Sequence, residues 1–138
     1  MSLCPCSKER CIVDKEKGIG KGAHNQRGLI TLQVKCQPGH FHIEDLVRLA
    51  ESSGSAEIYT LLKRPDEEYV TIKSYENPKF VEDIVREVSS KVIRNLNGVN
   101  WFRVRVSNQE SIHNHDAVAY ISRKKSGQRW IISNHGFY

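Results

Sequence analysis

Residues 101–121, WFRVRVSNQESIHNHDAVAYI, contain the pattern that decides the fold. Residues 102–106 alternate between apolar and polar side chains, which is the period of a half-buried β-strand. The apolar run at residues 117–121 predicts a second strand. The polar residues 110–115, ESIHNH, therefore lie where two strands meet, and a fixed backbone there can hold binding or catalytic side chains. A hairpin loop with solvated histidines is the alternative, because Glu-x-x-His is a short and common pattern.

The other predicted elements place two helices among the strands. They are a strand at about 29–36, a helix at 42–53, an extended segment at 56–62, a second helix from 77 to about 96 and a last strand at 128–133. Apolar residues at helical spacing support both helices, and Asn77-Pro78 is a good helix start. Because no nucleotide-binding β-α-β signature occurs, this order predicts an α+β domain with an antiparallel sheet and two helices on one face.

Several local patterns carry expectations about burial. Cys36 falls on the same strand face as Ile30, Leu32 and Val34, so it is expected in the core. Core positions are likewise expected for the aromatic residues of the strands: Trp101, Phe102, Tyr120 and Trp130. Residues 63–68 predict a polar turn. Residues 1–22 predict either a loose tail or a loop that something else, such as a thiolate-held metal, ties down.

Composition narrows the class of protein. At 138 residues the chain is one domain, and a buried catalytic cleft would strain it, so a site shared between subunits is attractive. The net charge of +5 and the pI near 9.1 favour anionic partners such as nucleotides, phosphates or nucleic acid. No membrane span or signal peptide is expected, because long apolar runs are absent. Four cysteines without such a signal predict a reducing, cytoplasmic setting.

Three motifs near the N-terminus bear on chemistry. Cys4-Pro5-Cys6 lacks the spacing of a structural zinc knuckle, so Cys4 is a candidate ligand of a mixed metal site or an ordinary free thiol. The glycine-rich residues 18–22 lack the Walker spacing and predict a flexible connector. In residues 22–28, GAHNQRG, an imidazole and a guanidinium flank two amides directly before a strand.

Five blocks of sequence together resemble a known family. They are CPCSKE (4–9), GAHNQR (22–27), LLKRPDE (61–67), NPKFVED (77–83) and ESIHNH (110–115). In this order they are similar to the type IB GTP cyclohydrolases, from Cys4 to about Ile121, and specifically to the second, C-terminal half of that family's protein. The resemblance implies the tunnelling fold, in which antiparallel sheets of several modules close a β-barrel and active sites lie between modules. It also implies conversion of GTP to 7,8-dihydroneopterin triphosphate and formate, for folate biosynthesis.

The resemblance further implies a divalent metal. Water must attack the purine C8, formate must leave and the pterin ring must close, and such hydrolysis suits a Lewis acid. Carried over position by position, the metal ligands are Cys4 and His113, with Glu67 and His24 as candidates for the rest. A thiolate, a carboxylate and imidazoles accept Zn²⁺, Mn²⁺ or Fe²⁺, and the sequence does not rank these metals.

The same resemblance assigns roles around GTP. Glu110 matches the acid that clamps the N–H edge of guanine, since a carboxylate accepts two parallel hydrogen bonds. His24 or His115 would shuttle protons, and Cys4 is counted with them among the catalytic residues. Four cations are expected on the triphosphate: Arg27, Lys63, Arg64 and Lys8.

The chain is shorter than the proteins of that family, and this difference leaves other functions to be considered. The family protein is roughly twice as long, so a half-length chain must rebuild its barrel from its own copies or from a partner. We expect a homo-oligomer with sites between subunits, residues 1–27 forming the metal and substrate segment and residues 28–138 the tunnelling-fold module. The basic ending, residues 123–138, matches nothing we can assign.

The alternatives are an enzyme of the same fold acting on another purine or pterin, an inactive half, or a basic nucleic-acid-binding module. Against nucleic acid as a partner, the aromatic residues lie in strand patterns typical of a core and not of a stacking platform.

Overall fold

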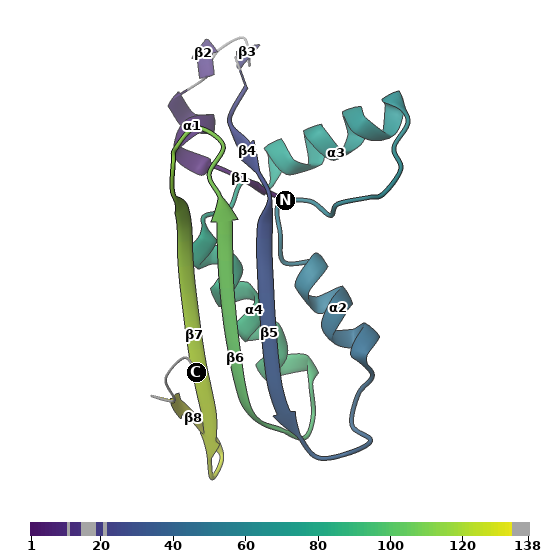
Figure 1. Ribbon diagram of the computed structural model, residues 1–138, viewed down its shortest axis with the longest axis vertical. Coiled ribbons are helices and arrows are strands. Elements are labelled where there is room, and N and C mark those ends of the chain that lie inside the picture. The colour runs from purple at the N-terminus through teal and green to yellow at the C-terminus, as the bar shows by residue number, and fades with distance from the viewer. Residues whose placement is uncertain (11, 15–18, 21, 134–138) are drawn as a thin grey trace.

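A four-stranded antiparallel sheet in the order β5-β6-β7-β8 forms the centre of the fold (Figure 1). The computed structural model describes residues 1–10, 12–14, 19–20 and 22–133. Within them, the sheet strands are β5 (Gly28–Cys36), β6 (Val99–Gln109), β7 (Asp116–Ser126) and β8 (Arg129–Ile132). The described helices are α1 (Pro5–Arg10), α2 (Ile43–Glu51), α3 (Arg64–Glu76) and α4 (Val81–Asn95). The smaller strands are β1 (Ser2–Leu3), β2 (Ile12–Asp14), β3 (Ile19–Gly20) and β4 (Asn25–Gln26).

These elements confirm the predicted α+β class with an antiparallel sheet. Helices α2 and α4 cover one face of the sheet, as expected (Figure 1). The core between them consists mainly of residues from α4 and β6, with one from α2: Leu49, Val81, Ile84, Val85, Val88, Val92, Leu96, Val99, Phe102, Val104 and Val106. From Phe102 to Val106, every second residue of β6 enters this core, because alternate side chains of a strand share a face. Among the described residues, no helix has the length and apolar character that crossing a bilayer requires.

Helix α4 begins later than Asn77-Pro78 suggests. The backbone N–H of Phe80 donates to Asp83 Oδ2 at 3.0 Å, so the helix starts at Val81 with a carboxylate capping its first turn. Asn77 instead donates through Nδ2 to the backbone oxygens of Gly54 and Ser55. The helix ends as predicted, and Gly98 adopts a φ of +74° in the turn into β6, a conformation that favours glycine.

Helix α3 is the main element that the sequence did not predict. The expected polar turn at residues 63–68 is wrong, because residues 64–68 form the first turns of this helix and Lys63 is its N-cap. Asp66 Oδ2 accepts a hydrogen bond from the backbone N–H of Lys63 at 2.9 Å, and Pro65 suits a first helical turn. Only Val70 and Ser74 of α3 are buried, so the helix lacks the apolar stripe that periodicity detects.

Three burial expectations are also wrong. Cys36 is exposed, because the pairing of β5 with β6 shifts register between Lys35 and Cys36 and breaks the alternation there. Tyr120 is 60% exposed and Trp101 is outside the core, since both lie on the face of the sheet that carries no helix. Phe102 is buried as predicted, and its ring meets that of Trp130 edge to face at 5.2 Å.

The N-terminal residues are tied down by protein contacts. Ser2 Oγ donates to the backbone oxygen of Lys79 at 3.0 Å, and Leu3 N donates to Ser55 Oγ at 3.2 Å. Strand β1 pairs with β4, with Ser2 opposite Gln26. A loose tail is therefore wrong for this end of the chain. Of the predicted connector at residues 18–22 and the basic ending, residues 18, 21 and 134–138 lie outside the described residues.

The segment before α4 is held by a cluster of charges. Lys79 Nζ lies 2.5 Å and Lys91 Nζ 2.8 Å from the two carboxylate oxygens of Glu87. Burial raises the pKa of Glu87, but the hydrogen bonds from both lysines lower it more, and the net pKa is below its ordinary value of 4.5. Because the pKa of Glu87 is lower in the folded than in the unfolded state, its ionised carboxylate stabilises the fold when the pH is above 4.5. This contribution is lost as the pH falls below about 4.5.

We therefore expect Glu87→Gln to lower the free energy of unfolding at pH 7 by about 1 kcal/mol, and by much less at pH 3. Urea unfolding of both proteins at the two pH values measures this difference. Glu76→Gln, which changes an exposed carboxylate at the end of α3, is the control and should change neither value. An equal loss at pH 7 and pH 3 for Glu87→Gln would contradict a role for the charge.

Candidate active site

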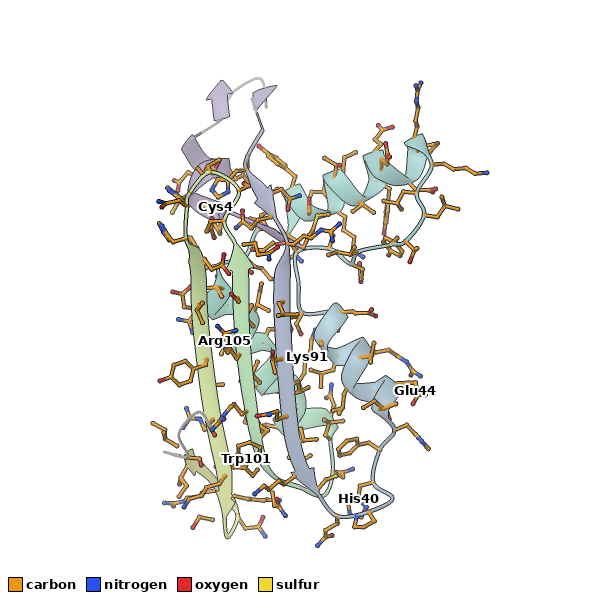
Figure 2. All side chains as sticks on the ribbon, viewed as in Figure 1. Cys4, His40, Glu44, Lys91, Trp101 and Arg105 are labelled. Carbon is orange, nitrogen blue, oxygen red and sulfur yellow. The ribbon has the colours of Figure 1, made fainter. Side chains whose placement is uncertain are left out.

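A small pocket lies where the N-terminal strands meet the end of β6. Its volume is about 180 Å³. It is lined by residues from five separate parts of the chain: Cys4, Gln26, Lys79, Phe80, Val81, Glu82, Asn108, Glu110 and Ala117. Figure 2 labels Cys4 at the end of the sheet where β6 and β7 are joined. The fold thus brings the first, second, fourth and fifth blocks of the resemblance to one place.

A buried amide connects an imidazole to a carboxylate at this pocket. His24 Nδ1 lies 2.8 Å from Gln26 Oε1, and Gln26 Nε2 donates to Glu110 Oε1 at 3.1 Å. Gln26 is 7% exposed, and the side chains of His24 and Glu110 are 12% exposed each. Residues 24 and 26 lie on one side of an extended segment, so their side chains are neighbours. Strand β5 then pairs with β6, and Glu110 directly follows the last residue of β6.

Cys4 lies next to His24 through the backbone. The N–H of Cys4 donates to the backbone oxygen of His24 at 3.3 Å, and the N–H of His24 donates to Ser7 Oγ at 3.2 Å. Cys4 is half-buried and its thiol is free. Helix α1 starts directly after it, and the N–H of Lys8 donates to the oxygen of Cys4 at 3.1 Å. These hydrogen bonds therefore fix the backbone of Cys4 beside that of His24.

The donor types fit a divalent metal, but the described residues do not complete its ligand set. A thiolate and an imidazole suit Zn²⁺ or Fe²⁺. Among the residues that the structure describes, no three His, Cys, Asp or Glu side chains gather into a group that could hold a metal. Cys4 and His24 are thus two ligands at most, and any others must come from elsewhere.

The other predicted ligands lie further out. His113 and His115 are exposed in the loop between β6 and β7, where their rings stack with centroids 5.3 Å apart. Glu67 is exposed in the first turns of α3. This helix projects from the sheet, with its C-terminal end towards β1 and its N-terminal end pointing away (Figure 1). The structure therefore does not bring Glu67 to the pocket of the same copy.

The four cations predicted for the triphosphate are spread over the surface. Lys8 already has partners, because its Nζ lies 2.5 Å from the backbone oxygen of Tyr75 and 4.5 Å from the centre of that ring. Arg27 is exposed at the entry to β5. Lys63 and Arg64 are exposed at the start of α3, far along the same projecting helix as Glu67. Arg27 directly follows Gln26, and Lys8 lies in the helix that directly follows Cys4, so these two cations lie in segments that also contribute to the pocket.

Asn108 is a site residue that the sequence analysis missed. It is 2% exposed, and its Nδ2 donates to Ser2 Oγ at 3.0 Å. Its Oδ1 has no hydrogen-bond partner among the described residues. A Cβ at position 28 would lie 2.7 Å from that oxygen, which explains the glycine there. The strand pattern alone assigns Asn108 only to a face of β6, and gives no sign of this contact.

The pocket is too small for a nucleotide. Ligand pockets commonly measure about 300 to 1,000 Å³, and this pocket of about 180 Å³ is smaller than that range. Six of its nine lining residues are polar or ionisable, but apolar atoms supply most of the lining surface. The described residues therefore form a pocket that can hold only part of a nucleotide.

Comparison with known proteins identifies the family. A family model described as type I GTP cyclohydrolase folE2 matches residues 1–119. The chain is 48% identical over 124 residues to GTP cyclohydrolase FolE2 of Syntrophobacter fumaroxidans, covering 90% of this chain and 44% of the relative. It is 50% identical over 124 residues to the Geobacter metallireducens protein of the same name, covering 90% and 44%. The chain spans less than half the length of these relatives. It belongs to the type I GTP cyclohydrolase FolE2 family.

Proposed function

We propose that this chain carries the active-site module of a metal-dependent GTP cyclohydrolase of type IB, and corresponds to the C-terminal half of the longer family proteins. The reaction is hydrolysis of GTP to 7,8-dihydroneopterin triphosphate and formate, in folate biosynthesis. The observation that carries the proposal is the contact between Gln26 and Glu110, 84 residues apart, beside His24 and Cys4. Family membership supports the same activity.

In this proposal Glu110 binds the guanine. One carboxylate oxygen already accepts from Gln26, and lone pairs on both oxygens are available to the N–H edge of a purine. His24 and His115 are the proposed proton shuttles, because imidazole titrates near neutral pH. Arg27 is the cation best placed for the triphosphate, with Lys63, Arg64 and Lys8 as further candidates.

The proposed metal is Zn²⁺, Mn²⁺ or Fe²⁺. Cys4 and His113 would hold it, with His24 and Glu67 as the remaining candidates. When bound, the metal supplies a Lewis acid for the hydrolysis. Cys4 and His24 come from the pocket of one copy, and Glu67 would come from a neighbouring copy, since α3 projects away from its own sheet.

The proposed assembly is a homo-oligomer with the tunnelling fold. Within the described residues, β5 and β8 are the edge strands of the sheet, and an unpaired edge is a template for another strand. We propose that further sheets pair along these edges to close a β-barrel. Helix α3 and the segment before it expose Leu61, Tyr69 and Ile72, which supply apolar area for contacts between copies. The free cysteines of the described residues accord with our proposal that the protein works in the cytoplasm.

Incubating the purified chain with GTP and Mn²⁺, Zn²⁺ or Fe²⁺ tests the activity, with pterin fluorescence and released formate as the readouts. We expect both products, and we expect the molecular mass in solution to be that of several copies. Metal binding without either product would leave an inactive half or an enzyme for another purine or pterin, which assays with those compounds would identify.

A second candidate function is binding of single-stranded nucleic acid by the helix-free face of the sheet. On this face Lys35 Nζ and the Arg103 guanidinium lie 5.5 and 5.6 Å from the centre of the Trp101 ring. Tyr120 is exposed opposite Arg105 in the strand register, and Figure 2 labels Trp101 and Arg105 along β6. Aromatic rings interleaved with cations suit stacked bases and phosphates. Salt-sensitive binding to random DNA without GTP turnover would favour this function.

A further inference from the structure

We infer that Gln26 is a positioning residue that fixes both the tautomer of His24 and the orientation of Glu110. This inference rests on the proposed function for its consequences, but its structural part can be tested alone. Gln26 lies between the two side chains, and its amide oxygen and nitrogen each have one of them as partner. Because Gln26 is only 7% exposed, water has little access to replace either hydrogen bond.

The orientation of the amide follows from the carboxylate. An ionised carboxylate only accepts hydrogen bonds, so the group that faces Glu110 Oε1 at 3.1 Å must be the NH₂ of Gln26. The amide oxygen therefore faces His24 Nδ1 at 2.8 Å. Because a carbonyl oxygen also only accepts, the hydrogen of neutral His24 must lie on Nδ1.

This assignment leaves Nε2 of His24 with its lone pair. A bare Nε2 can accept a proton or bind a metal, which are the two roles proposed for His24. An unconstrained neutral imidazole in water prefers the opposite tautomer, with the hydrogen on Nε2. Gln26 thus holds His24 in the tautomer that the proposed reaction uses. The buried hydrogen bond from Nδ1 to Gln26 Oε1 stabilises that tautomer.

The same amide orients Glu110. A direct ion pair between His24 and Glu110 does not account for the arrangement, because Nδ1 and Oε2 are 3.9 Å apart, beyond hydrogen-bond distance. The NH₂ group of Gln26 instead holds Oε1, which fixes the plane of the carboxylate before guanine arrives. Groups that are positioned in advance lose less entropy on binding.

Nitrogen NMR of the metal-free full chain, labelled with ¹⁵N at histidine, tests the tautomer without any turnover. The spectra are recorded at about pH 9, above the ordinary pKa of free imidazole, and the protonated and bare nitrogens of a neutral ring have well separated shifts. His24→Asn identifies the signals of His24. We expect hydrogen on Nδ1 in the wild type and in Gln26→Glu, whose carboxylate still accepts from Nδ1, and a shift towards hydrogen on Nε2 in Gln26→Leu. Hydrogen on Nε2 in the wild type would overturn the inference.

Steady-state kinetics with GTP tests the second half of the inference. Gln26→Glu keeps the acceptor for His24 but removes the donor to Glu110 and adds a repelling charge. We expect its KM to rise about tenfold with kcat little changed, whereas Gln26→Leu should also lower kcat about tenfold. Gln33→Leu, an exposed glutamine of β5, is the matched control and should behave as wild type.

The outcomes separate this inference from the proposed function. Kinetics in which Gln26→Glu and Gln26→Leu change kcat and KM alike would overturn the division of roles. If the wild type had no GTP turnover, the proposed function would fail, while the NMR result would still confirm or overturn the tautomer. If Gln26→Leu did not fold, the spectra of the wild type and Gln26→Glu would still decide the tautomer of His24.

Discussion

Replacing Glu110 with alanine is expected to lower kcat/KM for GTP about a hundredfold or more while leaving bound metal in place. The carboxylate is proposed to accept two charge-assisted hydrogen bonds from guanine, each of about 1.5 to 3 kcal/mol. Their loss also leaves the NH₂ of Gln26 without its partner in a buried site. Pterin fluorescence and metal content per chain measure the two effects separately.

Two further variants sharpen this experiment. Glu68→Ala removes an exposed carboxylate from α3 and is the control for charge, so its kcat/KM should equal that of wild type. His113→Ala is expected to lose metal as well as turnover, because His113 is a proposed ligand. Equal turnover in Glu110→Ala and His113→Ala, with equal metal content, would show that we assigned the two roles wrongly.

Replacing Cys4 with serine is expected to remove tightly bound metal and reduce GTP turnover to background. A serine hydroxyl stays protonated and is a poor ligand for Zn²⁺ or Fe²⁺ where a thiolate is a good one. The fold should persist, because the contacts of Cys4 that hold the chain are backbone hydrogen bonds. Metal analysis after dialysis and circular dichroism check both statements.

Cys6→Ser is the matched control for Cys4→Ser. Cys6 is exposed two residues further along, in α1, and the same change of sulfur to oxygen there should leave metal content and turnover as in the wild type. Full metal content in Cys4→Ser would remove Cys4 from the ligand set. Loss of metal in both variants would point to general damage of the N-terminal segment.

The sheet was predictable from sequence because its pattern is local. Residues 102–106 alternate, the register pairs them with β5 and β7, and both helices of the covered face show apolar periodicity. Helix α3 was not predictable in the same way, since its stability depends on a carboxylate cap and a few contacts and not on an apolar stripe. Cys36 was misplaced because a register shift cannot be read from alternation.

The candidate site was predictable only in part. Glu110, His24 and Cys4 stood out because ionisable groups recur in the blocks of the resemblance. Gln26 and Asn108 did not, because an amide in a strand has no sequence signature, and their importance comes from partners 84 and 106 residues away. The sequence also grouped Glu67 with Cys4, whereas the fold places Glu67 on a helix that projects from the sheet.

Proton NMR of a guanine nucleotide beside bound Mn²⁺ tests most directly whether metal and guanine share this pocket. 7-Deaza-GTP retains the proton at C8 but lacks the N7 that ring opening requires, so it can be observed at equilibrium. With the wild-type chain we predict strong broadening of that proton by Mn²⁺, and little broadening with Cys4→Ser or Glu110→Ala. A C8 proton that stays sharp while both Mn²⁺ and the nucleotide are bound would contradict a common site for metal and guanine.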